Sequence, residues 1–90
     1  MPLRFRDREL RVTRSESAEV VFFLVEDPVA GKQHRLYEME YEVARLFDGS
    51  RSVDKVATLI NKRRKVSLQA TDVEKFAGQL LALGFVVEVA

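Results

Sequence analysis

The sequence predicts an α+β domain of winged-helix-like architecture, because its parts carry different hydrophobic patterns. Residues 1–37 contain alternating and β-branched apolar segments, which are typical of strands. Residues 38–84 repeat apolar side chains at the spacing of amphipathic helices, with an Asp48-Gly49 turn after the first helix. Residues 85–89 are apolar again and predict a last short strand. Three short helices flanked by strands favour the winged-helix-like arrangement.

The expected strands follow the apolar pattern of the first part. Residues 10–13 alternate apolar and polar side chains and predict a half-buried strand, which a polar turn at residues 14–17 ends. Residues 19–25 are apolar on both faces, which favours a central strand with both faces covered. A loop at residues 27–32 contains Pro and Gly, and it joins this strand to the next one at residues 33–37 as an antiparallel hairpin.

The helix ends carry clear local signals. The first helix is expected over residues 38–47, with Gly49 as a left-handed C-cap. Ser52 is a suitable N-cap for the second helix. Residues 71–74 (Thr-Asp-Val-Glu) fit a capping box for the third helix, which Gly84 ends.

Composition narrows the class of protein. The 90 residues correspond to one domain, residues 1–90, with 47% hydrophobic and 32% charged residues, the balance of a soluble globular protein. No apolar run approaches the roughly 20 residues that span a bilayer, and the first residues lack a secretory signal, so we expect a cytoplasmic protein. The absence of Cys and the single His exclude a thiolate or multi-histidine metal site. We therefore expect no metal and no cofactor.

Catalytic motifs are missing from the sequence. There is no Gly-rich phosphate loop and no Ser in a nucleophile elbow. His34 is the one possible histidine base, but no nucleophile or orienting acid stands at a spacing that would serve it. A solvent-facing or partly packed strand histidine is the simpler interpretation, and we expect the protein not to be an enzyme.

Two groups of basic residues need an explanation. Residues 62–65 (Lys-Arg-Arg-Lys) either contact phosphates or, as we prefer, lie at the negative C-terminal end of the second helix. With Lys and Arg at 15 and Asp and Glu at 14, the net charge of +1 argues against bulk attraction to nucleic acid. The N-terminal arginines alternate with acids and form either a solvated face or a docking surface for an acidic partner; they are Arg4, Arg6, Arg8, Arg11 and Arg14.

A small sheet has an edge strand with unpaired N–H and C=O groups, with which a strand of another chain can pair. Such an edge accepts a peptide as an added strand if an apolar groove lies beside it. The alternative is an edge that charges such as Lys32 and Arg35 protect from pairing. The pattern alone leaves both open.

Several segments, taken in order, resemble the PqqD-like family, whose members are also called RiPP recognition elements. They are the Asp27-Pro28 turn, the His34-Arg35-Leu36-Tyr37 strand, Leu46-Phe47-Asp48-Gly49, Ser52-Val53-Asp54-Lys55-Val56 and Leu80 to Val86. The resemblance covers residues 10–89. It implies a three-stranded antiparallel sheet packed on a three-helix bundle, and a non-catalytic module that binds the leader of a ribosomally made precursor peptide and presents it to a modifying enzyme or exporter.

The family resemblance also implies a binding site. The leader adds as a strand to the edge of the third strand, in a groove that the third helix walls. Phe76 belongs to this wall and also to the apolar stripe of its helix. Carried over to this sequence, the peptide-binding residues are Gln33, His34, Arg35, Leu36 and Tyr37 from the strand, and Asp72, Lys75, Phe76 and Gln79 from the helix.

Two features depart from the family or point beyond it. The first helix begins with Tyr37-Glu38-Met39 in place of a polar cap. Residues 27–35 look most like PqqD-like domains at the front of larger export or membrane-peptidase proteins, so the chain could be an excised domain whose partner is a protein.

Two alternative functions stay open. One is a winged helix that binds DNA through Arg51 and residues 62–65, and the other is an oligomerisation module whose edge pairs with a second copy in a homodimer.

Overall fold

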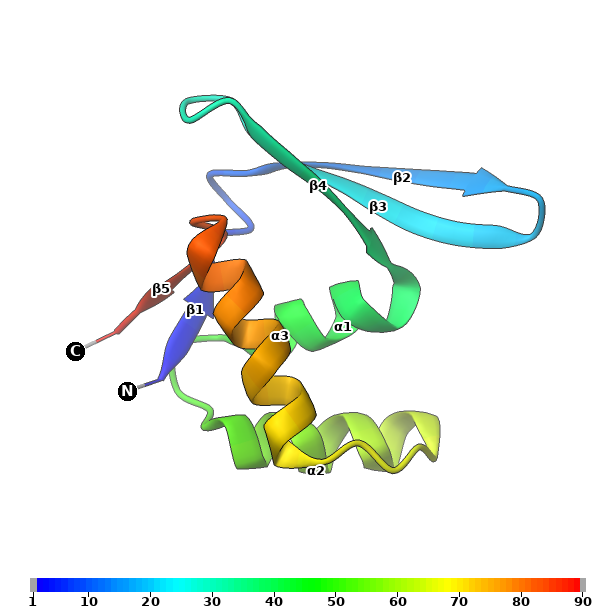
Figure 1. Ribbon diagram of the computed structural model, residues 1–90, viewed down its shortest axis with the longest axis vertical. Coiled ribbons are helices and arrows are strands. Elements are labelled where there is room, and N and C mark those ends of the chain that lie inside the picture. The colour runs from blue at the N-terminus through cyan, green and yellow to red at the C-terminus, as the bar shows by residue number, and fades with distance from the viewer. Residues whose placement is uncertain (1, 90) are drawn as a thin grey trace.

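The computed structural model describes residues 2–89 and has an α+β fold with two antiparallel sheets and three helices (Figure 1). The larger sheet has the strand order β2-β3-β4, and the smaller sheet pairs β1 with β5. The elements are β1 Leu3–Phe5, β2 Arg11–Ser17, β3 Val20–Asp27, β4 Lys32–Tyr37, α1 Glu38–Leu46, α2 Val53–Arg64, α3 Ala70–Ala82 and β5 Val86–Glu88.

Strand β1 has no counterpart among the expected elements. It pairs antiparallel with β5, with Leu3 opposite Glu88, so the two ends of the chain lie side by side (Figure 1). The N–H of Phe5 donates to the Phe47 carbonyl at 2.8 Å, and the N–H of Gly49 donates to the Leu3 carbonyl at 2.9 Å. A three-residue strand is too short to show a periodic pattern, and its partners are remote in the sequence.

The expected polar turn at residues 14–17 is wrong, because these residues are the second half of β2. Ser17 lies opposite Val20, and the turn consists of Ala18 and Glu19. Their φ angles of 48° and 68° are positive, as a two-residue hairpin loop requires. Residues 14–17 are polar because this end of the hairpin projects past the helices into solvent, as Figure 1 shows.

Strand β3 is central as predicted, but the prediction that both its faces are covered is wrong. Its inner face packs on α1, where the Phe23 ring stacks on Tyr41. The outer face carries Val20, Phe22 and Leu24, and no helix contacts it. Val20 is 46% exposed, and Phe22 and Leu24 are half-buried.

The predicted end of α3 is confirmed in detail. Gly84 has a φ of 76°, its N–H donates to the Leu81 carbonyl, and the N–H of Phe85 donates to the Leu80 carbonyl. These two backbone hydrogen bonds form a Schellman motif. The motif requires a positive φ at Gly84, which glycine adopts without strain. Leu80 and Phe85 are both fully buried, which supplies the apolar contact that accompanies the motif.

Two other helix ends differ from their predictions. The capping box of α3 is formed by Gln69 and Asp72, because the helix begins two residues before Asp72 and not after Thr71. Helix α1 ends at Leu46 and its C-cap is Phe47, whose backbone is extended, so Gly49 is not its cap. Gly49 does have a positive φ of 92°, but it serves the loop that approaches β1.

Ser52 caps α2 as predicted, since its hydroxyl accepts the N–H of Lys55 at 3.2 Å. Replacing Ser52 by Ala is expected to lower the free energy of unfolding by about 1 kcal/mol, because one N–H of the first turn loses its partner. Urea denaturation followed by circular dichroism measures the change. Ser67→Ala, at an exposed position before α3, is the control and should change stability by less than about 0.5 kcal/mol.

The core consists of two apolar clusters, with α1 contributing to both. The first lies under the larger sheet and includes Leu36, Leu80 and Phe85. The second lies among the helices and includes Phe47 and Ile60. Helix α1 contacts α2 and α3, and those two contact each other. In residues 2–89, no helix has the length and apolar content needed to cross a membrane.

Candidate functional site

Strand β4 lies at an edge of the larger sheet, so one of its sides has no partner strand. The two-residue loop makes Ser17 and Val20 a hydrogen-bonded pair. Hydrogen-bonded and non-hydrogen-bonded pairs alternate along an antiparallel ladder. The backbone groups of Val20 and Phe22 therefore point toward β2, and those of Phe23 point toward β4.

The same alternation identifies the free backbone groups of β4. Leu36 lies opposite Phe23, so its N–H and C=O point toward β3, and those of Gln33 and Arg35 point outward. Tyr37 agrees with this assignment, because its N–H donates to Glu40 Oε1 at 2.9 Å and not to a strand. The open edge thus offers two N–H and two C=O groups.

The side chains of β4 differ in their availability. Gln33, His34, Arg35 and Tyr37 are exposed, whereas Leu36 is 0% exposed and belongs to the core. Leu36 therefore has neither a free side chain nor outward backbone groups to offer a ligand. The Arg35 guanidinium lies 4.5 Å above the centre of the Phe22 ring, on the outer face of the sheet.

The candidate residues on α3 are also of two kinds. Asp72, Lys75 and Gln79 are exposed, and Phe76 is half-buried against both core clusters. Asp72 is occupied locally, because its Oδ2 accepts the N–H of Gln69 at 3.0 Å. No Cα atom of α3 lies within 8 Å of one in β4, and the two elements meet where the Lys32 ammonium donates to the Ala82 carbonyl at 3.4 Å.

An apolar pocket of about 150 Å³ lies between α1 and α3, close to the point where β4 runs into α1. Asp72 and Phe76 were expected at the site and line this pocket. The other lining residues were not expected there; they are Met39, Glu40, Val43, Leu68 and Val73. Met39, Val43 and Val73 fall in apolar helical stripes, and a stripe has the same pattern whether it is covered or faces a pocket.

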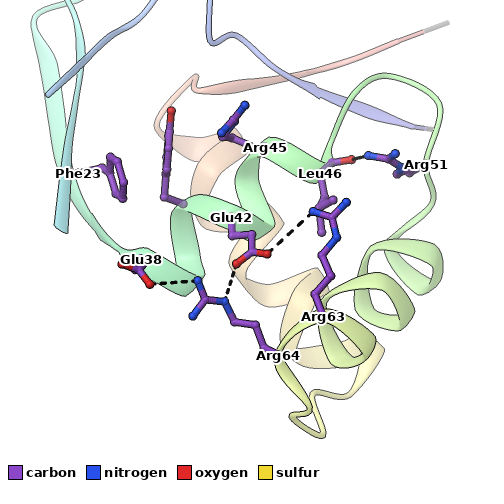
Figure 2. Close-up of a pocket in the computed structure, with 9 residues that line it drawn as sticks. Phe23, Glu38, Glu42, Arg45, Leu46, Arg51, Arg63 and Arg64 are labelled. Atoms are coloured by element: carbon purple, nitrogen blue, oxygen red, sulfur yellow. Dashed lines mark hydrogen bonds and ion pairs between the residues drawn. The ribbon is translucent and has the colours of Figure 1, made fainter. Parts of the chain in front are cut away.

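A second, larger cavity of about 630 Å³ lies on the other side of α1, between α1, α2 and β3 (Figure 2). Its wall is rich in charge. Arg64 of α2 bridges Glu38 and Glu42 of α1, and Arg63 approaches Glu42 at 3.9 Å. The hydrogen bond that Arg64 donates to Glu42, followed by the one it donates to Glu38, raises the pKa of Arg64 above its usual value.

These ion pairs explain part of the basic cluster at residues 62–65. Arg63 and Arg64 contact acids of α1, and Lys65 ends α2 in the left-handed conformation with a φ of 53°. The interpretation of the cluster as a helix end is therefore consistent with the structure. Within residues 2–89, no three His, Cys, Asp or Glu side chains gather as a possible metal site.

Comparison of the chain with models of known protein families, with curated proteins and with solved structures finds no match.

Proposed function

We propose that this protein is a non-catalytic peptide-binding module that captures a segment of another chain as a strand added to β4. The observation that carries the proposal is the open edge of β4 at Gln33 and Arg35, together with an apolar pocket between α1 and α3 near the C-terminal end of that strand. The resemblance to the PqqD-like family supplies the ligand class: the leader of a precursor peptide, held for a modifying enzyme or an exporter in the cytoplasm.

The finer fold assignment belongs to the same proposal. We infer a winged-helix arrangement in which β2, β3 and β4 pack on a bundle of α1, α2 and α3. The order of the elements and the mutual contacts of the three helices support it. The chain works either alone or as a module of a larger export or peptidase protein, and pairing of the β4 edges of two copies is a competing use of the same surface.

The edge supports binding of modest strength. Four backbone hydrogen bonds contribute about 2–6 kcal/mol in total, at about 0.5–1.5 kcal/mol each. One aliphatic side chain in the apolar pocket adds about 1.5–3 kcal/mol. After the costs of ordering the peptide, we expect dissociation constants of about 1 μM.

The position of the pocket predicts where the ligand carries its apolar anchor. The pocket lies at the C-terminal end of β4, where the chain enters α1. In an antiparallel addition, the N-terminal end of the ligand strand lies next to the C-terminal end of β4. An aliphatic residue just before the added strand would therefore reach Val43, Val73 and Phe76.

Arg35→Pro tests the edge directly. Proline removes the outward N–H of residue 35 and places a ring where the added strand would pair, while no ladder bond to β3 is lost. Arg14→Pro is the matched control, since the same alternation directs the N–H of Arg14 to the free edge of β2. Fluorescence anisotropy with labelled peptides encoded beside the gene should show affinity falling at least about tenfold for Arg35→Pro. Arg14→Pro should bind like the parent protein.

Two results would contradict the proposal. One is that no encoded peptide binds and that amide chemical shifts at residues 33–37 and in α3 stay unchanged throughout the titration. The other is equal loss of binding in Arg14→Pro and Arg35→Pro. Duplex DNA at low salt is included in the titrations, because retardation of DNA would favour the nucleic-acid alternative.

A further inference from the structure

Four arginines from three segments line the larger cavity (Figure 2), which lies on the side of α1 opposite the apolar pocket. Arg45 comes from α1, Arg51 from the loop after it, and Arg63 and Arg64 from α2. Two carboxylates, Glu38 and Glu42, share the wall, so the lining carries a net charge of 4 − 2 = +2. The whole chain carries only +1, so positive charge is concentrated at this cavity.

Two of these arginines, Arg45 and Arg63, make no side-chain hydrogen bond within residues 2–89. Arg64 is held by both glutamates, and Arg51 donates to the Leu46 carbonyl at 3.1 Å. Arg63 reaches a carboxylate only at 3.9 Å. Within residues 2–89, Arg45 makes no hydrogen bond and no ion pair, and its guanidinium lies 5.8 Å from the centre of the Tyr41 ring. Each guanidinium has five N–H donors in a fork that matches a carboxylate.

An aromatic surface adjoins these free donors. Phe23 and Tyr41 line the cavity, and their rings stack with centroids 4.0 Å apart and planes inclined by 22°. Both residues are half-buried, so part of the stack faces the cavity. The cavity therefore combines cations with a flat apolar wall, and a bare inorganic anion would use only the cations.

The cationic lining extends beyond this cavity. Arg45 also lines a neighbouring hollow of about 310 Å³, to which Arg4 and Arg8 contribute. Asp7 and Asp48 lie in the same hollow. Arg45 lines both spaces, and we name them together the arginine groove. A groove of this kind fits an extended ligand with several separate anionic groups.

We infer that the arginine groove binds an acidic segment of a partner polypeptide. Its Asp or Glu carboxylates would pair with Arg45 and Arg63, and an apolar side chain of the segment would pack on the Phe23–Tyr41 stack. A nucleic acid fits less well, because its evenly spaced phosphates would approach Glu38 and Glu42. A peptide places its carboxylates one at a time and avoids those acids. The inference goes beyond the proposed function. It involves no residue of β4, and the arginine groove lies on the side of α1 opposite the apolar pocket.

The test uses the capped, fluorescein-labelled peptide Asp-Phe-Asp-Phe-Asp as the probe and Asn-Phe-Asn-Phe-Asn as its neutral counterpart. In fluorescence anisotropy the acidic peptide should bind and the neutral one should not. Arg45→Gln should weaken binding about tenfold, because the charged guanidinium that donates hydrogen bonds to one carboxylate of the peptide is lost. Arg11→Gln is the matched control, as it removes the same charge from an exposed position on the outer face of β2. It should leave the affinity unchanged.

Three results would overturn the inference. The first is equal binding of the acidic and neutral peptides, and the second is an equal loss of affinity in Arg11→Gln and Arg45→Gln. The third is tighter binding of a short DNA duplex than of the acidic peptide, with the same dependence on Arg45. Arg35→Pro should not change binding of the acidic peptide, so a failure of the proposed β4 site remains distinguishable from a failure here.

Discussion

Replacing Leu36 by Ala is expected to lower the free energy of unfolding by about 2–5 kcal/mol. Leu36 is fully buried under the larger sheet, in the same cluster as Leu80 and Phe85, so truncation leaves a cavity that rigid neighbours cannot fill. A domain of this size has about 5–13 kcal/mol in total, so the variant would lose a large share of its stability. Urea denaturation followed by circular dichroism measures the loss.

His34→Ala is the matched control for this experiment. His34 lies two residues earlier on β4, on the same face of the strand, but it is exposed. Its replacement should change stability by less than about 0.5 kcal/mol. If both variants unfold at the same urea concentration, Leu36 does not have the packing role that its burial indicates.

Asp27→Asn is expected to destabilise the protein at neutral pH and to make its stability less dependent on pH in the acid range. Asp27 is the one buried charged residue in the described part of the chain. Its Oδ1 accepts the N–H groups of Val29 and Ala30, and its Oδ2 accepts a hydrogen bond from Arg6 at 3.1 Å. Arg6 also donates to the Gly84 carbonyl at 2.7 Å, so this carboxylate links the N-terminal segment, β3 and the end of α3.

The direction of the pH effect follows from the pKa of this carboxyl. The hydrogen bond from the Ala30 N–H, followed by that from Arg6, lowers the pKa of Asp27 below its ordinary value of 3.8. A lowered pKa means that the charged form stabilises the fold above pH 3.8, and that this contribution is lost as the pH falls through the lower, folded value.

Urea denaturation at a series of pH values checks this prediction. The difference in stability between the parent protein and Asp27→Asn should be largest near pH 7 and should shrink as Asp27 becomes protonated. Asp7→Asn, at an exposed position, is the control and should follow the parent at every pH. A difference that stays constant down to the acid limit would mean that the charge of Asp27 does not stabilise the fold.

Two of the helix ends could be predicted from sequence because their causes are local. A hydroxyl three residues before an amide caps α2 at Ser52, and a glycine at positive φ completes the end of α3 at Gly84. The start of α3 was misplaced because Thr71 with Glu74 fits the usual capping-box residue types, whereas the box that forms uses Gln69 and Asp72 at the same spacing. The residue types therefore favour the wrong pair, and local preference alone did not place the start of this helix.

The candidate site was predictable only in part. Residues 33–37 were assigned to a strand from the sequence, and only the family resemblance pointed to that strand as the edge, which the sheet order β2-β3-β4 makes it. Which of these residues face outward depends on the ladder, and the ladder depends on a turn at Ala18 and Glu19 that composition did not indicate. Met39 and Leu68 were missed, because they join Phe76 at the pocket only once α1 and the segment before α3 have packed together.

The sequence by itself determined the α+β class, the order of most strands and helices, and the caps at Ser52 and Gly84, because these depend on propensity and short-range periodicity. Only the tertiary structure decided that Leu3–Phe5 is a strand, that Leu36 is core, and that Arg45, Arg51 and Arg63 line one cavity. Pairing, burial and convergence of charge arise between residues that are distant in sequence. No local pattern encodes such contacts, and they exist only once the helices and sheets have packed together.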